Sequence, residues 1–384
     1  MLKFFRILRI ILKAKFVFYV PSHKEILIFD KESQNALAEF FTNKKGNIFI
    51  LETRKESINF YILYLLIKKR EKINYQNYLR NIIQLVKPKI VITTIDNSIL
   101  FYKIKKFFPD VIFISIQGTI HFFVGDILEI LKRNKDEDKY NLDYYFVYSD
   151  SYAQEIKKYI KSNYIVIGSI KNNFFKSSNE HKKKTLGYIS RFPQILYDYS
   201  KYKKINKNNY EIWEYKLFEF CLKLLKNLKS YCIKNKIKLN VIGANNNSGI
   251  EYSFYNEILG SDILSFLPRR GNYGSYEKID RFEVLINPMS SLGYEAIARK
   301  KKVAFFSEDE CVGSNFGWPI IKEKKGNFYS NSANEDEIDR VISYLFRISE
   351  EDWQKEWSLL NKKYFYYDAG NAILKDYLSK IVSK

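Results

Sequence analysis

The sequence predicts an α/β protein in which two doubly wound parallel sheets face each other across a cleft. Three observations lead to this fold class. Short β-branched runs alternate with longer helical patterns along the whole chain, the strand-like runs are almost continuously apolar, and 384 residues are enough for more than one domain. Strands that lack a polar face are typical of a parallel sheet that helices cover on both sides.

Six strand-like runs lie in the first half of the chain, and helical patterns separate some of them. The strands are predicted at residues 25–30, 47–52, 89–94, 111–117, 143–148 and 164–168. The helices are predicted at residues 57–69 and 75–86. This order is that of βαβ units, in which each helix returns the chain to the next parallel strand.

The second half repeats the same alternation after a polar run at residues 176–184, which is the best linker candidate. Strands are predicted at residues 185–190, 237–242, 263–266, 283–287 and 302–306, and helices at 215–234, 292–298, 335–347 and 350–362. We therefore predict an N-terminal domain, residues 1–175, and a C-terminal domain, residues 185–384. A final helical pattern at residues 369–383 could cross back to the first domain.

Composition excludes several classes of protein. Three cysteines and three histidines are too few for a disulfide scaffold or a Cys/His zinc framework, and 46% hydrophobic residues exclude general disorder. The net charge of +21 favours an anionic partner. The lysines are scattered through the helical patterns without a recognisable nucleic-acid-binding motif, so we expect no nucleic acid among the partners. The acidic runs at 136–138 and 308–310 are interpreted as solvated, and we expect neither a metal nor a cofactor.

The first 16 residues combine an apolar stripe with frequent cations. This pattern suits a helix that lies on an anionic membrane surface, and it suits equally a first helix packed on the protein's own core. The cations interrupt the segment too often for a secretory signal, and no apolar run is long enough to span a membrane. We therefore expect a cytoplasmic protein, with peripheral attachment to the inner membrane through residues 1–16 as an open alternative.

Residues 282–306 form the most informative segment, because they predict a strand, a tight turn, a helix and a second strand. Ser290 and Ser291 supply the cap at the start of the helix, Gly293 leaves room for close approach, and Glu295 lies in the first turns. The free N–H groups at such a helix start bind phosphate, and a nearby carboxylate suits ribose hydroxyls. The alternative is that the serines only cap the helix and that Glu295 is solvated.

A second set of polar residues follows two predicted strands in the first half. Asp96 and Asn97 follow one strand, and Gln117, Gly118 and His121 follow the next. Carboxyl ends of neighbouring parallel strands open onto one crevice, where a ligand would bind. If the ligand reacts through a hydroxyl group, a carboxylate or a histidine must accept its proton, and Asp96 is the first candidate and His121 the second. The alternatives are an Asx-type helix cap and a half-buried structural histidine.

Three further polar residues lie beside the predicted cleft in the second half. Ser190 and Arg191 end a strand, and Arg269 precedes a glycine-containing loop together with Arg270. A guanidinium group pairs with both phosphate and carboxylate, so Arg191 and Arg269 are candidates for donor binding. A plain surface role for the arginine pair is the alternative.

Residues 290–296 (SSLGYEA) with 302–306 (KVAFF) resemble the donor-binding segment of GT-B glycosyltransferases that build bacterial surface polysaccharides. The nearest group is that of O-antigen and capsule enzymes, including Kdo- and sialic-acid-like transferases. Residues 96–97, 117–118, 143–169, 317–319 and 325–328 add to the resemblance. The resemblance implies two Rossmann-type domains, of which the second binds the nucleotide. It also implies that Ser290, Ser291 and Gly293 contact the phosphate, that Glu295 contacts the ribose, and that the transfer needs no metal.

The function that follows is transfer of a sugar from a nucleotide donor to a glycan or lipid-linked glycan acceptor. An ulosonic acid from a CMP-activated donor fits, because an arginine could recognise its carboxylate. Nucleotide-sugar epimerases and polyol-phosphate transferases share the expected architecture and are the nearest alternatives. A catalytically silent scaffold of glycan assembly and a nucleic-acid-binding protein are the alternatives from other classes.

Overall fold

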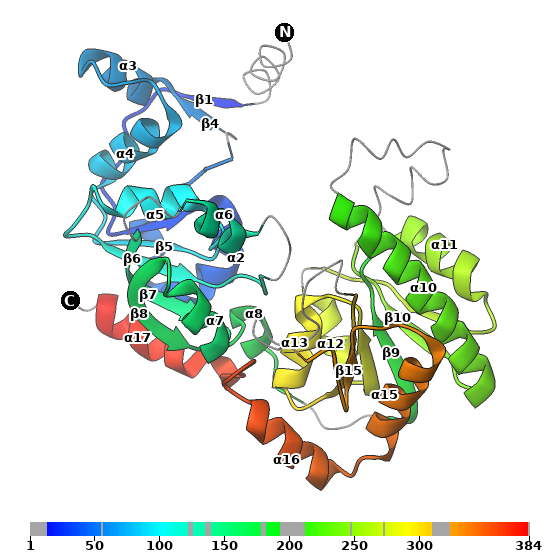
Figure 1. Cartoon of the computed structure of the whole chain (residues 1–384). Coiled ribbons are helices and arrows are strands. Elements are labelled where there is room, and N and C mark those ends of the chain that lie inside the picture. Colours follow the sequence, from blue (N-terminus) through cyan, green and yellow to red (C-terminus); the bar gives the residue numbers. More distant parts are fainter. Residues whose placement is uncertain are drawn as a thin grey trace.

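The computed structural model contains two α/β halves, each built around a parallel sheet (Figure 1). It describes residues 14–54, 57–121, 126–134, 140–177, 182–192, 212–245, 248–271, 273–308 and 323–382. The predicted segments 1–13 and 317–319 lie outside these residues, as do most of the acidic runs and the centre of the predicted linker.

The first half contains a six-stranded sheet with the order β3-β2-β5-β6-β7-β8, in which every pair is parallel. Its strands are β2 (Ile26–Phe29), β3 (Ile48–Leu51), β5 (Ile90–Thr93), β6 (Ile112–Ile116), β7 (Tyr140–Val147) and β8 (Ile160–Val166). The strand order reverses between β2 and β5, and ligands of such sheets bind beyond the carboxyl ends of the strands at that point.

Both faces of this sheet are buried at β2, which is apolar at every position. In β2, Leu27 and Phe29 face one core while Ile26 and Ile28 face the other. The helices and 3-10 helices of this half are η1 (Lys31–Ser33), α2 (Gln34–Leu37), η2 (Ala38–Asn47), α3 (Phe60–Lys68), α4 (Tyr75–Val86), α5 (Ile99–Lys105), α6 (Ile127–Arg133), α7 (Asp150–Ile156) and α8 (Ile170–Asn173).

The second half contains a seven-stranded sheet with the order β11-β10-β9-β12-β13-β15-β14, parallel except for the pair β14–β15. Its strands are β9 (Lys182–Ile189), β10 (Leu239–Ile242), β11 (Leu264–Leu267), β12 (Phe282–Asn287), β13 (Lys302–Phe306), β14 (Lys325–Gly326) and β15 (Tyr329–Ser330). Its helices are α10 (Ile212–Asn235), α11 (Ser248–Leu259), α12 (Gly274–Ile279), α13 (Ser291–Ala298), α15 (Glu335–Arg347) and α16 (Glu350–Leu360). The order reverses between β9 and β12, so the residues after these two strands lie at the switch point.

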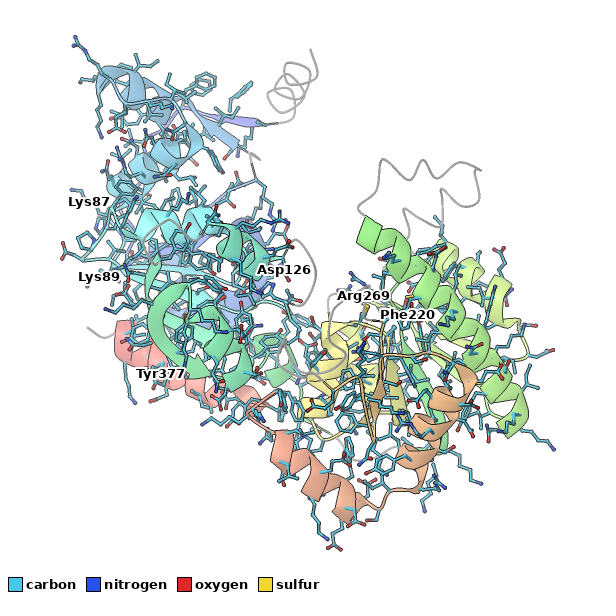
Figure 2. All side chains as sticks on the ribbon, in the orientation of Figure 1. Lys87, Lys89, Asp126, Phe220, Arg269 and Tyr377 are labelled. Carbon is cyan, nitrogen blue, oxygen red and sulfur yellow. The ribbon has the colours of Figure 1, made fainter. Side chains whose placement is uncertain are left out.

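The chain then returns to the first half through η4 (Ala369–Asn371) and α17 (Ala372–Val382) (Figure 1). The apolar side of α17 consists of Leu374, Leu378 and Ile381, which join the same core as Ile26 and Ile28. Tyr377, labelled in Figure 2, packs edge-on against Phe146 of β7, with their ring centroids 5.8 Å apart. The first sheet is therefore covered on one face by a helix that follows the second sheet in the chain.

The predicted fold class is confirmed, but three local predictions were wrong. Residues 57–59 form the strand β4 (Ser57–Asn59) instead of the start of a helix, and β4 pairs in parallel with β1 (Lys15–Val17). Residues 15 and 16, predicted to end an amphipathic helix, are therefore extended. The end of the predicted linker, Lys182 to Lys184, belongs to β9, so the second sheet begins before residue 185.

Candidate functional site

A cavity of about 300 Å³ lies between the two halves, at the switch point of the second sheet. Polar residues predicted for donor binding line it: Ser190, Arg269, Ser290, Ser291 and Glu295. The first half contributes Gly118, Thr119 and Lys171 to the same walls. The structure thus brings together four separate segments that sequence reasoning had placed near a cleft, and it adds Lys171 from a fifth.

The start of α13 is held by hydrogen bonds within its own turn. Ser290 is the N-cap, and its hydroxyl accepts a hydrogen bond from the Leu292 N–H at 3.3 Å. The side chain of Asn287 accepts from the Ser290 N–H at 2.9 Å and donates to the Ser290 carbonyl at 3.0 Å. A Cβ atom on Gly293 would lie 2.2 Å from the Asn287 side chain, so glycine is required here for packing. This corrects our expectation that Gly293 makes room for a ligand.

Ser291 links α13 to the loop that follows β6 in the first half. Its hydroxyl lies 2.6 Å from the Thr119 hydroxyl and accepts a hydrogen bond from the Ile120 N–H at 3.1 Å. The predicted phosphate-binding serine therefore already contacts the opposite half. A ligand phosphate at this helix start would have to share or replace these bonds.

Glu295 is buried at the same interface and is only 5% exposed. Its carboxylate accepts hydrogen bonds from the Ser169 hydroxyl at 2.5 Å and the Tyr148 hydroxyl at 3.3 Å, both from the first half. Burial raises the pKa of Glu295 above its usual range, although the bond from Ser169 opposes the shift. The interpretation of Glu295 as a solvated acid was therefore wrong, because the side chain ties the two halves together.

Ser190 and Arg269 shape the opposite wall of the cavity. The Ser190 hydroxyl donates to Glu251 at 2.5 Å, and Glu251 also accepts from the backbone N–H of Ala244 at 2.8 Å. Arg269, labelled in Figure 2, donates to the carbonyl groups of Ala244 and Gly271. Arg191, the other predicted donor residue, is exposed and is not among the residues that line this cavity.

A second cavity, of about 240 Å³, adjoins the first and lies at the switch point of the first sheet. Asp96 and Asn97 line it, and Gly118, Thr119 and Lys171 line both cavities. Gly118 is constrained to be glycine, because a Cβ atom there would lie 2.3 Å from the carbonyl oxygen of Thr94. The predicted sugar-binding residues Asn97 and Gly118 therefore do lie together at the edge of a cavity.

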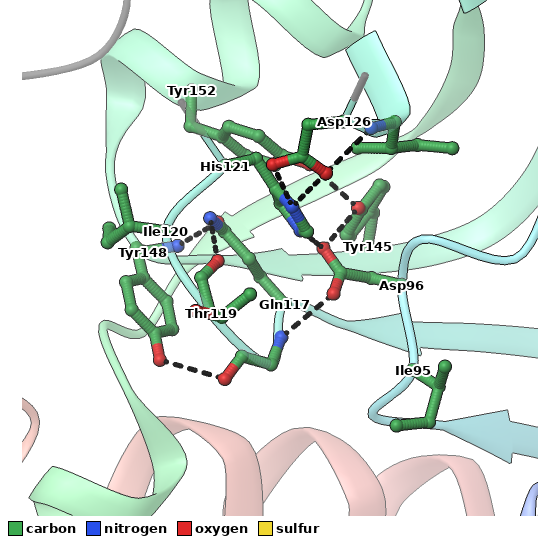
Figure 3. Close-up of polar contacts among 12 residues, drawn as sticks. Ile95, Asp96, Gln117, Thr119, Ile120, His121, Asp126, Tyr145, Tyr148 and Tyr152 are labelled. Carbon is green, nitrogen blue, oxygen red and sulfur yellow. Dashed lines mark hydrogen bonds and ion pairs between the residues drawn. The ribbon is translucent and has the colours of Figure 1, made fainter. Parts of the chain in front are cut away.

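Asp96 belongs to a buried network that Figure 3 shows in close-up. One carboxylate oxygen lies 2.6 Å from Nε2 of His121, and the other accepts from the Gly118 N–H at 3.1 Å. Nδ1 of His121 lies 2.8 Å from Asp126, so the imidazole bridges two carboxylates. The Tyr145 hydroxyl donates to Asp96 at 3.0 Å. Asp96 is thereby fixed in one orientation at the cavity wall.

His121 has the environment of a charged imidazolium. It is 1% exposed, and burial alone would lower its pKa. The charge of Asp96 and the hydrogen bonds to Asp126 and Asp96 outweigh burial and raise the pKa of His121 to about 10. Both ring nitrogens then donate to carboxylates, and His121 lines neither cavity. This arrangement leaves Asp96, and not His121, as the candidate that faces a substrate.

This raised pKa predicts how stability depends on pH. Because the folded-state pKa exceeds the ordinary value of 6.5, the stabilisation is complete below about pH 6.5 and is lost as pH rises toward 10. Over that window, the free energy of unfolding of the wild-type protein should fall more steeply than that of His121→Gln, by at most about 1.4 kcal/mol per pH unit. Urea unfolding of both proteins from pH 6 to 10 measures the difference, and parallel pH profiles would contradict a charged His121.

Gln117 was expected to contact a sugar, but its amide supports the backbone instead. Its Nε2 donates to the Thr119 carbonyl at 2.8 Å, and its Oε1 accepts from the Tyr148 N–H at 2.8 Å. The side chain is 1% exposed and lines neither cavity. Gln117 therefore fixes the loop that carries Gly118 and Thr119.

Sequence reasoning missed several residues of this site. Lys171 and Ser169 follow β8, Tyr148 follows β7, and Asp126 caps α6 through a bond from the Ile127 N–H. Their position after the carboxyl ends of strands is the same signal that identified Asp96, and it could have found the first three. Asp126 gave no such signal, because its partner His121 lies in an irregular loop.

Within the described ranges, no group of three or more His, Cys, Asp or Glu side chains is arranged to hold a metal ion. In the same ranges, no helix is both long enough and apolar enough to cross a lipid bilayer. Metal-independent chemistry stays a prediction of the sequence.

Three solved structures with similar architecture are described as UDP-N-acetylglucosamine 2-epimerases or as a complex with UDP. The putative UDP-N-acetylglucosamine 2-epimerase from Listeria monocytogenes has a TM-score of 0.53 at 9% identity, and the match covers 94% of this chain and 98% of that protein. Another UDP-N-acetylglucosamine 2-epimerase has a TM-score of 0.52 at 10% identity, and the match covers 94% of this chain and 97% of that protein. The S. aureus MnaA–UDP structure has a TM-score of 0.50 at 12% identity, and the match covers 94% of this chain and 98% of that protein. At such identities the likeness establishes the fold alone, which is GT-B.

Comparison of sequences gives a more specific result. No curated protein matches the chain. A family model described as "putative O-antigen biosynthesis protein" matches residues 114–382, which include the loop after β6, the whole second sheet and α17. The match covers more than half of the chain, and the chain therefore belongs to this O-antigen biosynthesis protein family.

Proposed function

We propose that this protein is an enzyme that binds a nucleotide sugar between its two halves and transfers the sugar to a surface-glycan acceptor. The observation that carries the proposal is the cavity of about 300 Å³ at the start of α13, where Ser290, Ser291 and Glu295 meet Lys171 of the first half. Membership in an O-antigen biosynthesis family supports a glycan as the product.

The walls of this cavity suit the parts of a nucleotide sugar. The partial positive charge at the start of α13 attracts phosphate, and Lys171 and Arg269 add full positive charges on either side. Glu295 lies on the same helix and would accept hydrogen bonds from ribose hydroxyls. To do so it must exchange the hydroxyl groups of Ser169 and Tyr148 for those of the ligand.

The adjoining cavity places Asp96 where an acceptor would lie. Gly118, Thr119 and Lys171 line both cavities, so a donor in one and an acceptor in the other would meet at these residues. In this arrangement Asp96 takes the proton of the attacking hydroxyl, and the leaving phosphate is stabilised by α13 and Lys171. His121 and Tyr145 hold the carboxylate in place.

The proposal extends to the donor and the acceptor. An ulosonic acid from a CMP-activated donor would offer a carboxylate to Arg269, which lines the donor cavity. The acceptor is a glycan or a lipid-linked glycan, and the reaction proceeds without a metal. Residues 1–16 would bring the enzyme to the membrane that carries a lipid-linked acceptor.

Nucleotide binding can be tested by thermal unfolding in the presence of CMP, UDP, GDP or CDP. A ligand that binds only the folded protein at a hundred times its Kd adds about 2.7 kcal/mol of stability. We expect CMP or UDP to raise Tm by a few degrees, and we expect Glu295→Gln to abolish that shift because the amide cannot replace the carboxylate.

The matched control is Glu356→Gln on α16, whose carboxylate accepts from the Tyr344 hydroxyl and lines neither cavity. This variant should retain the full ligand-induced shift. If none of the four nucleotides changes Tm, the nucleotide-binding proposal is refuted.

Epimerisation of a nucleotide sugar is a second candidate, because two of the similar structures are described as UDP-N-acetylglucosamine 2-epimerases and a third contains UDP. Asp96 would then act on the sugar ring instead of on an acceptor hydroxyl. Incubation with UDP-N-acetylglucosamine alone distinguishes the two, since an epimerase forms a 2-epimer without any acceptor.

A further inference from the structure

The end of the first half formed by β1, β4 and α3 exposes an unusual number of large apolar side chains. In Figure 1 this unit lies at the opposite end of the first half from α17. Half of the exposed large apolar residues in the described part of the chain belong to this unit or directly follow β1. We call the following set the aromatic patch: Phe16, Phe18, Tyr19, Phe60, Tyr64 and Ile67.

Helix α3 explains why the patch is exposed. Its sequence, FYILYLLIK, is apolar on every side up to Lys68, whereas a surface helix normally has a polar outer face. Ile62 and Leu66 are fully buried. Phe60, Tyr64 and Ile67 lie on the other side, at spacings of four and three, and are 41%, 53% and 63% exposed.

The segment after β1 extends the same surface. Phe18 is 71% exposed and stacks on Phe60 with their ring centroids 5.1 Å apart, while Phe16 packs edge-on against Phe60 at 5.4 Å. The Asn59 side chain caps α3 and donates to the Tyr19 carbonyl at 3.0 Å. The patch is therefore an ordered surface held by defined contacts.

Among the described residues, the charged side chains around the patch are mostly cationic, and the one acidic group among them on the β4 side is Glu52, which interacts with Lys15 and Ser57. Lys15, Lys68, Lys69, Arg70 and Lys72 are exposed beside it. Glu71 is the one acidic residue between positions 57 and 75, and it is paired with Arg80 at 2.7 Å. The Lys68 ammonium lies 5.9 Å from the centre of the Tyr64 ring. An apolar surface with aromatic rings and a rim of cations has the chemistry of the boundary between lipid acyl chains and anionic headgroups.

We propose that the aromatic patch docks on an anionic lipid bilayer, with its apolar side chains among the acyl chains and the surrounding cations at the headgroups. A second copy of this chain is the poorer occupant, because it would bring two groups of cations together. The inference concerns described residues 16–67 and depends neither on residues 1–13 nor on the proposed catalytic function.

The test is cosedimentation of the full chain with vesicles of phosphatidylglycerol and phosphatidylcholine, compared with vesicles of phosphatidylcholine alone. We expect binding to the anionic vesicles that weakens at high salt. Loss of one large apolar contact lowers partitioning by about tenfold, so Phe18→Ser and Ile67→Ser should each do so, and the double variant more. Both side chains are exposed, so the variants should fold, and circular dichroism checks this.

The matched control is Leu359→Ser on α16, an equally drastic change at a side chain that is 79% exposed outside the patch. It should bind vesicles like the wild-type protein. The proposal is wrong if Phe18→Ser and Ile67→Ser bind as the wild type does, if the full chain binds no anionic vesicle, or if the patch variants only change the oligomeric state. A loss of binding seen in Leu8→Ser/Ile11→Ser and not in the patch variants would also overturn it.

Discussion

Replacing His121 with leucine should lower the free energy of unfolding by about 3–5 kcal/mol, because it leaves two carboxylates without their shared cation. Asp96 is 2% exposed, and its carboxylate lies 2.6 Å from Nε2 of His121. Without the imidazolium, Asp96 must be protonated or must recruit water into the core. Urea unfolding at pH 7 measures the loss.

His23 provides the matched control, since it is exposed on the segment before β2. His23→Leu should change stability by no more than about 0.5 kcal/mol, as expected for a surface position. If His121→Leu proves as stable as His23→Leu, the two carboxylates do not depend on the histidine, and the network of Figure 3 is not held by charge.

Asp96→Asn should lower the rate of sugar transfer by about 10²- to 10⁴-fold, the usual contribution of a positioned proton acceptor. The amide keeps the volume of the side chain and its bond from the Gly118 N–H, but it cannot take a proton from an acceptor hydroxyl. Asp96 lines the acceptor-side cavity and is absent from the walls of the donor cavity. The nucleotide-induced shift in Tm should therefore persist while the measured kcat falls.

The variant Asp126→Asn tests whether Asp96 acts in catalysis or only helps to hold His121 in place. Asp126 contacts the same histidine but lines neither cavity, so its replacement should reduce kcat far less than that of Asp96. Equal losses in the two variants would assign Asp96 a structural role. A fully active Asp96→Asn would remove it from the mechanism.

Much of the fold could be predicted because its elements carry strong local patterns. Helices α4 and α15 agree with the predicted residues 75–86 and 335–347, since each has a clear apolar stripe and an asparagine N-cap. The pairing of β1 with β4 could not be foreseen, because three-residue strands have no periodicity and form here only through each other. The helix was predicted from residue 57, although Asn59, the N-cap of α3, marks in the sequence where the helix begins.

Part of the candidate site could be predicted for a different reason, which is topology. Parallel strands place their carboxyl ends at one edge of a sheet, so Ser190 could be grouped with Ser290, and Asp96 with Gly118, without knowledge of any contact. What sequence reasoning could not supply is which polar atoms are already used by the protein. Gln117 and Gly293 lie where expected, but backbone bonds and close packing account for them.

The return of α17 to the first sheet has a consequence for how the protein is made on the ribosome. Strands β2 to β8 leave the exit tunnel long before α17 does, so the sheet face that Leu374, Leu378 and Ile381 cover stays open to water while the second half is being synthesised. Nascent chains that stall before residue 372 therefore expose an apolar surface, and we expect chaperones to bind these chains more than longer ones.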